Sequence, residues 1–168
     1  MAVVLYGPKA AGKSQVGGAL SDLYGVTPVD ADEIVLDLLA VARQPDPGNG
    51  WLTPIERAVT AALRDNAAVS VEATGAWDSD WQLALNLEAI PARVLRVWVS
   101  APLEVTLDRL ARRTSRKAPT TPDEARWIYD MSRVRAASQQ FDLSLDTGLL
   151  RHDEIPNALA PMAAALRQ

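Results

Sequence analysis

The chain has 168 residues, of which 48% are hydrophobic and 23% are charged, and these values are typical of one globular domain rather than of a disordered chain. Its formal net charge of −4 argues against a general nucleic-acid-binding protein, and the absence of cysteine excludes disulfide bonds and thiolate metal sites. No apolar run reaches membrane-spanning length and no signal peptide is recognisable. We therefore expect a single domain over 1–168 that is cytoplasmic, acts away from membranes, and is a monomer or homodimer.

Short apolar runs predict strands, and apolar residues at helical spacing predict the helices between them. The predicted strands are 2–6, 26–29, 67–71, 94–99 and 143–145. The predicted helices are 13–23, 33–42, 53–65, 78–88, 100–113, 122–140 and 153–166, the last kinked near Pro161. Strands and helices that alternate at this pace indicate an α/β fold around a parallel sheet. In such a fold ligands bind at the carboxyl ends of the strands.

Two of these helices carry the same start signal. Thr53-Pro54-Ile55-Glu56 and Thr121-Pro122-Asp123-Glu124 each combine a capping box with proline at the first helical position. We therefore expect Thr53 and Thr121 to be the N-cap residues.

The segment after the first predicted strand has the pattern of a phosphate-binding loop. From Gly7 to Ser14 it reads GPKAAGKS, which matches the P-loop pattern G-x-x-x-x-G-K-[ST]. The two glycines allow backbone N–H groups to point at phosphate oxygens, and the next helix adds its N-terminal positive charge. Lys13 supplies a cation for the β- and γ-phosphates, and Ser14 supplies a hydroxyl for Mg²⁺. The expected nucleotide-binding residues are Gly7, Pro8, Lys9, Ala10, Ala11, Gly12, Lys13, Ser14 and Gln15.

Carboxylates stand at the ends of the second and third predicted strands. Asp30 and Asp32 are two apart, so in an extended segment both would project to the same side and face the site. One can hold the metal while the other accepts a proton from an attacking hydroxyl, or one of them only caps the next helix. Glu72 can organise Mg²⁺ or bind the acceptor, and a solvated strand end is its alternative.

A basic segment separates two of the later helices. Its members are Arg109, Arg112, Arg113, Arg116 and Lys117. We expect a lid at about 112–121, because arginines on a closing loop can neutralise the charge that phosphoryl transfer develops. The alternative is a solvated helix face paired with nearby acids. Arg133 and Arg135 on the following helix are candidates for binding phosphates or an anionic acceptor.

The chain resembles the small P-loop kinases of the nucleoside-monophosphate-kinase type, and among them the shikimate- and gluconate-kinase-like branch. The resemblance rests on Gly7–Ser14, Val29–Ile34, Arg109–Lys117 and Asp142–Thr147. It implies a three-layer fold whose five-stranded parallel sheet has the order 2-3-1-4-5, with helices on both faces and a short lid. It also implies transfer of the γ-phosphoryl group of ATP to a small acceptor.

The resemblance further implies roles for single residues. Asp32 would bind the acceptor and act as the base, while Asp30 would help to order Mg²⁺. Arg113 would stack near the adenine, and Arg133 would approach the acceptor or the phosphates. The chain departs from shikimate kinases at Ala73-Thr74-Gly75, where those enzymes have three glycines.

We therefore expect an ATP- and Mg²⁺-dependent phosphotransferase that acts on a hydroxyl of a small metabolite or natural product. Catalysis is assigned to Lys13, Asp32, Arg113 and Arg116, with Arg109 and Arg113 completing the nucleotide site and Ser14 and Asp30 holding the metal. The acceptor site, centred on about 30–60, is assigned to Asp30, Asp32, Arg57, Glu72, Thr74, Gly75, Arg133 and Arg135. The alternatives are a nucleotide-binding regulatory ATPase module and a kinase of nucleosides or nucleic-acid ends.

Overall fold

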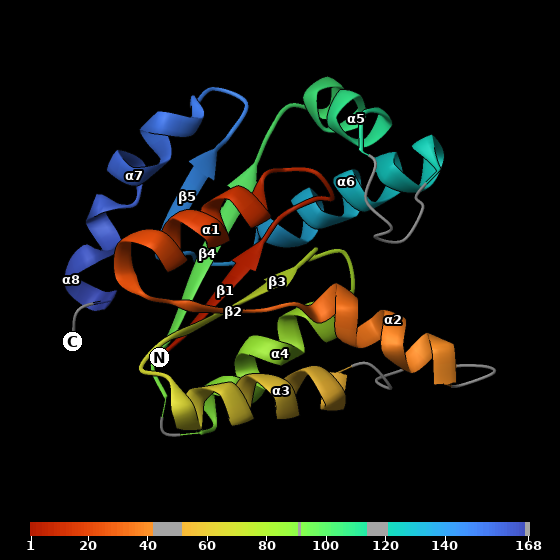
Figure 1. The fold of residues 1–168 in the computed structure, drawn as a ribbon. Coiled ribbons are helices and arrows are strands. Elements are labelled where there is room, and N and C mark those ends of the chain that lie inside the picture. The colour runs from red at the N-terminus through yellow and green to blue at the C-terminus, as the bar shows by residue number, and fades with distance from the viewer. Residues whose placement is uncertain (42–51, 91, 114–120, 167–168) are drawn as a thin grey trace.

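A computed structural model describes residues 1–41, 52–90, 92–113 and 121–166 of the chain. Its centre is a five-stranded sheet in the order β2-β3-β1-β4-β5, in which every pair of neighbours is parallel (Figure 1). The strands are β1 (Ala2–Tyr6), β2 (Thr27–Val29), β3 (Val69–Ala73), β4 (Val94–Ser100) and β5 (Leu143–Asp146). The predicted parallel sheet and its order are confirmed.

Helices connect the strands and cover both faces of the sheet, which confirms the three-layer α/β fold (Figure 1). They are α1 (Lys13–Tyr24), α2 (Ala31–Val41), α3 (Leu52–Asp65), α4 (Asp78–Glu88), α5 (Leu103–Ala111), α6 (Pro122–Ala136), α7 (Ile155–Ala158) and α8 (Ala163–Leu166). Two 3₁₀ turns, η2 (His152–Glu154) and η3 (Ala160–Met162), flank α7. None of the described helices has the length and apolar character needed to cross a membrane.

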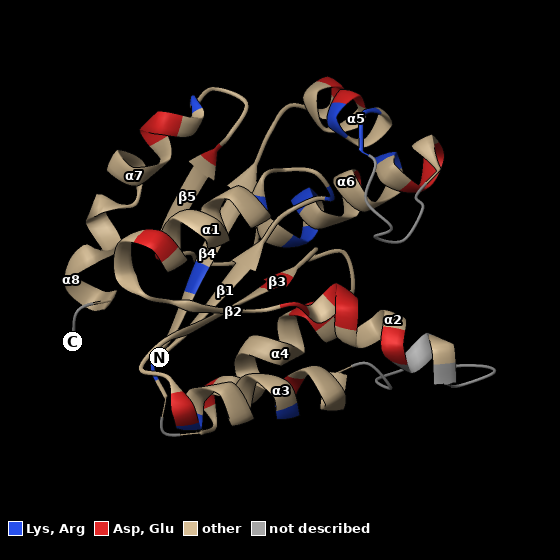
Figure 2. Cartoon of the chain, viewed as in Figure 1, with Lys and Arg blue, Asp and Glu red and all other residues tan. Residues whose placement is uncertain are grey.

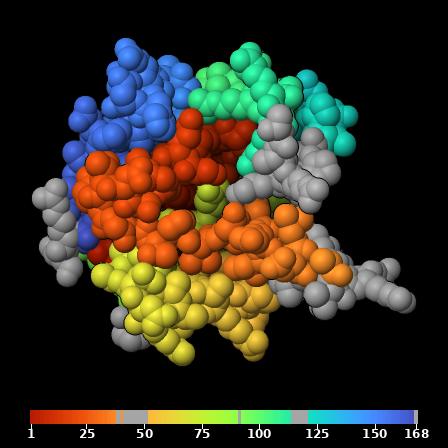
Figure 3. Space-filling view, viewed as in Figure 1, coloured from red at the N-terminus to blue at the C-terminus, as the bar shows by residue number. Residues whose placement is uncertain are grey.

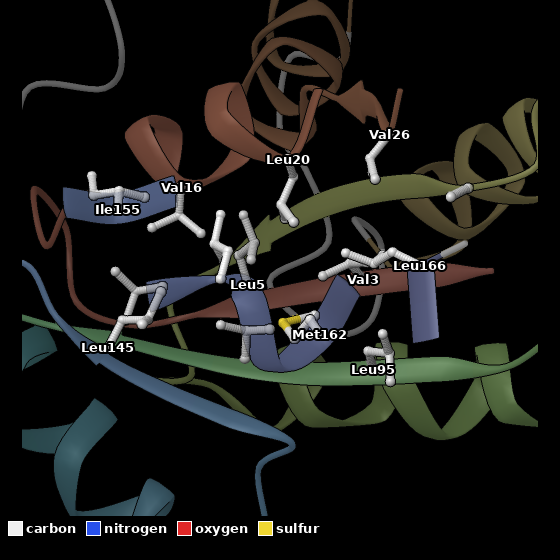
Figure 4. Packing of buried hydrophobic residues seen from close by; sticks show 14 of the residues in the cluster. Val3, Leu5, Val16, Leu20, Val26, Leu95, Leu145, Ile155, Met162 and Leu166 are labelled. Carbon is white, nitrogen blue, oxygen red and sulfur yellow. The ribbon is translucent and has the colours of Figure 1, made fainter. Parts of the chain in front are cut away.

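The central strand β1 is buried along its whole length. Val3 and Leu5 pack into a cluster with side chains of α1, α7 and α8 (Figure 4). Ala2, Val4 and Tyr6 pack into a second cluster with side chains of α3 and α4. A strand that is apolar throughout is expected in a parallel sheet covered on both faces. The carboxyl end of β1, from which the P-loop starts, is therefore held by both halves of the core.

Helix α2 begins at Ala31, two residues earlier than predicted. The Asp30 carboxylate accepts a hydrogen bond from the Glu33 N–H at 3.1 Å, and the Asp30 carbonyl accepts one from the Ile34 N–H at 3.3 Å. Asp30 thus caps α2, which is the alternative that the sequence left open. Asp32 lies in the first helical turn, so the prediction that both aspartates project from an extended segment is wrong.

Several other helix ends differ from the prediction. Helix α3 begins at Leu52, so Thr53 lies inside the helix and is not its cap. Thr121 does cap α6, as predicted, because its hydroxyl accepts a hydrogen bond from the Glu124 N–H at 3.2 Å. Helix α6 ends at Ala136, short of the predicted 140, and α5 ends at 111.

The predicted C-terminal helix over 153–166 is divided into α7, η3 and α8 instead of being one kinked helix. Pro156 and Pro161 lie within this stretch, and proline has no N–H to continue the helical hydrogen bonds. The pieces still bury Ile155, Leu159 and Met162 against the sheet, so the expected core face is kept.

Candidate active site

The P-loop joins β1 to α1 through a backbone that depends on its two glycines. Gly7 has φ +151° and Gly12 has φ +95°, in the region that favours glycine. A Cβ at Gly7 would lie 1.9 Å from the Val99 carbonyl oxygen, and one at Gly12 would lie 2.9 Å from Thr147 Oγ1. The loop therefore sits directly against the ends of β4 and β5, and larger residues at either position would displace it.

The P-loop lysine is buried beneath the loop. Lys13 Nζ donates hydrogen bonds to the carbonyl oxygens of Gly7 at 2.7 Å and Pro8 at 2.9 Å. Burial lowers the pKa of Lys13, and nearby carboxylates, Glu72 foremost, oppose this shift. A buried ammonium is stabilised by an anion, so a phosphate above the loop would give Lys13 a charged partner where it now has carbonyls.

A cavity of about 310 Å³ opens at the carboxyl ends of β1 and β3. Figure 3 shows the hollow between the P-loop and α2, with the end of β3 at its floor. Its lining residues are Lys9, Ala10, Gly12, Lys13, Ser14, Gln15, Asp32, Glu72, Ala73, Thr74, Arg109 and Arg113. Strand β1 lies between β3 and β4 where the order of connection reverses, which is where parallel α/β sheets bind ligands.

The cavity is lined by both signs of charge, with acids from α2 and β3 and cations from the P-loop and from α5 and the residues after it. Figure 2 shows acidic residues at the end of β3 and the start of α2, and acidic and basic residues together on α5 and α6. Strand β3 ends at Ala73 rather than 71, because its pairing with β1 continues to Tyr6 opposite Ala73. Glu72 therefore lies within the strand, not after it, and its side chain still lines the cavity.

Side-chain oxygens of the kind that bind Mg²⁺ line a second cavity beside α1. This cavity of about 290 Å³ shares Ser14, Asp32 and Glu72 with the first and adds Asp30 to its lining. A hydroxyl and carboxylates are the ligands that Mg²⁺ prefers. Among the described residues, no group of three or more acids and histidines is close enough to hold a metal alone. The arrangement fits a Mg²⁺ ion that takes one or two protein ligands and completes its shell with phosphate and water.

Arg109 braces the P-loop from the side of α5. Its guanidinium donates to the hydroxyl and the carbonyl of Thr147, both at 2.9 Å, and to the Ala10 carbonyl at 3.3 Å. The Thr147 hydroxyl in turn donates to the Ala11 carbonyl at 2.6 Å. The sequence placed Thr147 at a strand end but gave no signal that it holds the P-loop.

The predicted lid is described only at its edge. Arg113 follows α5, is exposed, and lines the cavity. Its neighbour Arg112 instead forms a 2.8 Å ion pair with Asp108, and both side chains face solvent. Arg116, with the rest of 114–120, lies outside the described residues.

Three predicted acceptor-binding arginines do not line the P-loop cavity. Arg57 is exposed on α3 and lines a separate pocket. Arg133 donates to the Tyr129 hydroxyl at 3.2 Å and lines another pocket, between α5 and α6. Arg135 pairs with Asp78 at the start of α4.

Sequence reasoning missed Asp80, in the first turn of α4. Its carboxylate accepts hydrogen bonds from the Thr74 hydroxyl at 2.6 Å and from the Trp77 N–H at 3.3 Å. Burial raises the pKa of Asp80, while these hydrogen bonds and the charge of Lys13 lower it. The predicted site residue Gly75 turns the chain between Thr74 and α4 at φ +72°. An acid three residues after Trp77, at the capping-box position, was the available signal.

No family model matches the chain. The shikimate kinase of Xanthomonas euvesicatoria pv. vesicatoria (strain 85-10) is 29% identical over 172 residues, which cover 97% of this chain and 92% of that protein. The tunicamycin resistance protein of Deinococcus radiodurans superposes with a TM-score of 0.71 at 21% identity, over 98% of this chain and 94% of that one. A gluconokinase from Sinorhizobium meliloti 1021 superposes with a TM-score of 0.64 at 19% identity, over 98% of this chain and 93% of that one.

At these identities the two structures show a shared fold alone, whereas the sequence match covers nearly the whole chain. The sheet order and the P-loop cavity at the ends of β1 and β3 agree with that match. The chain thus has the fold of the small P-loop kinases, and its sequence is similar to that of a shikimate kinase over nearly its whole length.

Proposed function

We propose that the chain transfers the γ-phosphoryl group of ATP to a hydroxyl of a small metabolite or natural product, with Asp32 as the base. The observation that carries this proposal is that Lys13, Ser14 and Asp32 line one cavity. Proteins catalyse phosphoryl transfer mainly by positioning the two substrates and by stabilising the charge that develops on the transferred group. A cation, a metal-binding hydroxyl and a carboxylate around one cavity supply these requirements.

On the donor side, the P-loop and Lys13 hold the β- and γ-phosphates of ATP. Ser14 and Asp30, which line one cavity, would hold Mg²⁺, and the Asp30 carboxylate also caps α2. When bound, Mg²⁺ offsets the negative charge of the phosphates. Arg109 and Arg113 line the same cavity and stabilise charge on the transferred group.

On the acceptor side, Asp32 takes the proton of the attacking hydroxyl as the new P–O bond forms and the bond to the β-phosphate breaks. The products are a phosphate ester and ADP. Asp32 suits this role because it projects from the exposed first turn of α2 into the cavity that Lys13 lines.

The test is a screen of hydroxyl compounds for ATP-dependent phosphorylation, with ADP release and product mass as the two readouts. Shikimate and gluconate head the panel because the relatives carry their names, and oligonucleotide ends and water are included. We expect transfer to a small hydroxyl compound that is lost in Lys13→Ala. ADP release that no acceptor stimulates would instead indicate an ATPase module.

A further inference from the structure

Resting on the proposed binding of ATP, we propose that Thr147 and Arg109 hold Ala10 of the P-loop in a strained backbone conformation. The loop then has its phosphate-binding shape before the nucleotide arrives. Thr147 is a positioning residue in this proposal, because it acts on the nucleotide through the loop, and Arg109 shares this task in addition to supplying its charge.

The strain lies at the fourth residue of the P-loop. Among the residues that the structure describes, Ala10 is the one non-glycine residue with a positive φ, at +58°. The Cβ of alanine makes this left-handed conformation unfavourable, and such residues persist only where the surrounding structure enforces them. The P-loop pattern leaves this position open, so the pattern itself does not require a glycine there. The contacts around Ala10 must therefore supply what a glycine would otherwise provide.

Ala10 is the third residue of a four-residue turn from Pro8 to Ala11. The Ala11 N–H donates to the Pro8 carbonyl at 3.2 Å, which closes the turn. A turn with positive φ at its third residue usually has glycine at that place. The Pro8 carbonyl also accepts a hydrogen bond from Lys13 Nζ at 2.9 Å. One carbonyl thus closes the turn and binds the phosphate-binding lysine, so a change in the turn would reach Lys13.

Two consecutive carbonyls of the turn are held from outside the loop. Arg109 donates to the Ala10 carbonyl at 3.3 Å, and the Thr147 hydroxyl donates to the Ala11 carbonyl at 2.6 Å. Arg109 also donates to the Thr147 hydroxyl at 2.9 Å, and the Thr147 N–H donates to the Ser100 carbonyl at 2.8 Å. These hydrogen bonds form a clamp that ties the turn to α5 and to the end of β4. The clamp opposes relaxation of Ala10 to a negative φ.

Strain and clamp together predict a coupling between residue 10 and Thr147. Without the clamp Ala10 relaxes, and the nucleotide must bind the small fraction of molecules whose loop regains the binding shape. A glycine at position 10 has no Cβ and adopts the left-handed conformation without help. Breaking the clamp should therefore weaken nucleotide binding strongly when residue 10 is alanine and weakly when it is glycine.

Calorimetric titration with MgADP tests this coupling. Thr147→Val should raise the Kd by about 10-fold, in line with the cost of the left-handed conformation for alanine. In the Ala10→Gly background the same substitution should raise the Kd by about 3-fold or less. Thr147→Ser, which keeps the hydroxyl, should recover most of the affinity. Equal losses in the two backgrounds overturn this inference alone, whereas a wild-type protein that binds no MgADP overturns the proposed function and this inference with it.

Ala11→Gly is the matched control for the glycine background. Ala11 is next to Ala10 in the turn but does not have a positive φ, so a glycine there relieves no strain. In the Ala11→Gly background, Thr147→Val should still raise the Kd by about 10-fold or more. A loss as small as in the Ala10→Gly background would mean that added flexibility is responsible rather than relieved strain, and it would overturn the proposal.

Arg109→Ala tests the other half of the clamp, and it replaces Thr147→Val if that variant does not fold. The substitution also removes a cation from the cavity, but this part of the loss does not depend on residue 10. We expect the rise in Kd for MgADP to be about 3-fold larger with alanine at position 10 than in the Ala10→Gly background. Circular dichroism and thermal unfolding check the fold of each variant. Equal rises in the two backgrounds would contradict the proposal.

Discussion

The two sides of the cavity are built in different ways. The phosphate side is a backbone loop whose glycines, Gly7 and Gly12, leave no room for a side chain against β4 and the residue after β5. The acceptor side is made of single side chains from separate elements, Asp32 from α2 and Thr74 from the end of β3. A backbone cradle fixed to the core binds a constant ligand, whereas separate side chains can be exchanged without moving the fold. The difference explains how one fold keeps its donor and varies its acceptor.

The largest effect is expected from Asp32→Asn, which removes the base and nearly keeps the shape. We expect kcat to fall by about 10²–10⁴-fold, the usual contribution of general base catalysis, while the affinity for ATP stays the same. Steady-state kinetics and calorimetric titration with a non-hydrolysable ATP analogue measure the two quantities. Asp37→Asn, on an exposed position of the same helix, is the control. A large loss of ATP affinity instead would move Asp32 to the donor side, as a metal ligand.

Lys13→Ala removes the one buried cation of the donor side that the P-loop pattern specifies. We expect kcat to fall by about 10²–10³-fold, in line with the loss of one preorganised charge contact. Affinity for ATP should fall as well, because Lys13 meets the nucleotide before and during transfer. Arg126→Ala, which removes an exposed cation paired with Asp123, should leave both values unchanged. Near wild-type turnover in Lys13→Ala would exclude Lys13 from the mechanism.

Thr147→Val tests whether the hydrogen bonds of Thr147 hold the P-loop in place. The substitution keeps the side-chain volume but leaves the Ala11 carbonyl and the Arg109 guanidinium without their hydroxyl partner. We expect the free energy of unfolding to fall by about 1–3 kcal/mol, as for a buried polar group left unpaired, and KM for ATP to rise. Urea unfolding and steady-state kinetics measure these. Ser144→Ala on the exposed face of β5 is the control, and a loss of stability with unchanged KM would limit Thr147 to the fold.

The contrast between a local backbone loop and side chains from separate elements also decides how much the sequence alone can predict. The P-loop was predictable because its glycines and Lys13 encode a local backbone, and the sheet order followed from the family resemblance. Asp80 was not predictable as part of the site, because its role depends on how Gly75 turns the chain back toward Thr74. Periodicity also could not decide between Arg133 and Arg135, and neither lines the P-loop cavity.

The acid pair shows a local limit of sequence reasoning. Asp30 and Asp32 are two residues apart, so their side chains would project to the same side only if the segment were extended. The Asp30 carboxylate instead accepts a hydrogen bond from the Glu33 N–H, and α2 begins two residues earlier than predicted. Asp30 is therefore the cap of the helix and Asp32 lies in its first turn. The residue types were informative, whereas their directions depended on where the helix begins.

The smallest effect separates two neighbouring arginines at the end of α5. Arg113 lines the cavity, while Arg112 pairs with Asp108 at 2.8 Å in solvent. We expect Arg113→Ala to lower kcat/KM for ATP by about 10-fold, as for one exposed charge contact with the transferred group. Arg112→Ala should change activity by less than about twofold, because an exposed ion pair contributes little. Kinetics of both variants at low and high salt measure the difference, which should shrink with salt only for Arg113. Equal losses in both variants would mean that these arginines act through the general positive charge of the segment, and Arg113 would then have no individual place in the nucleotide site.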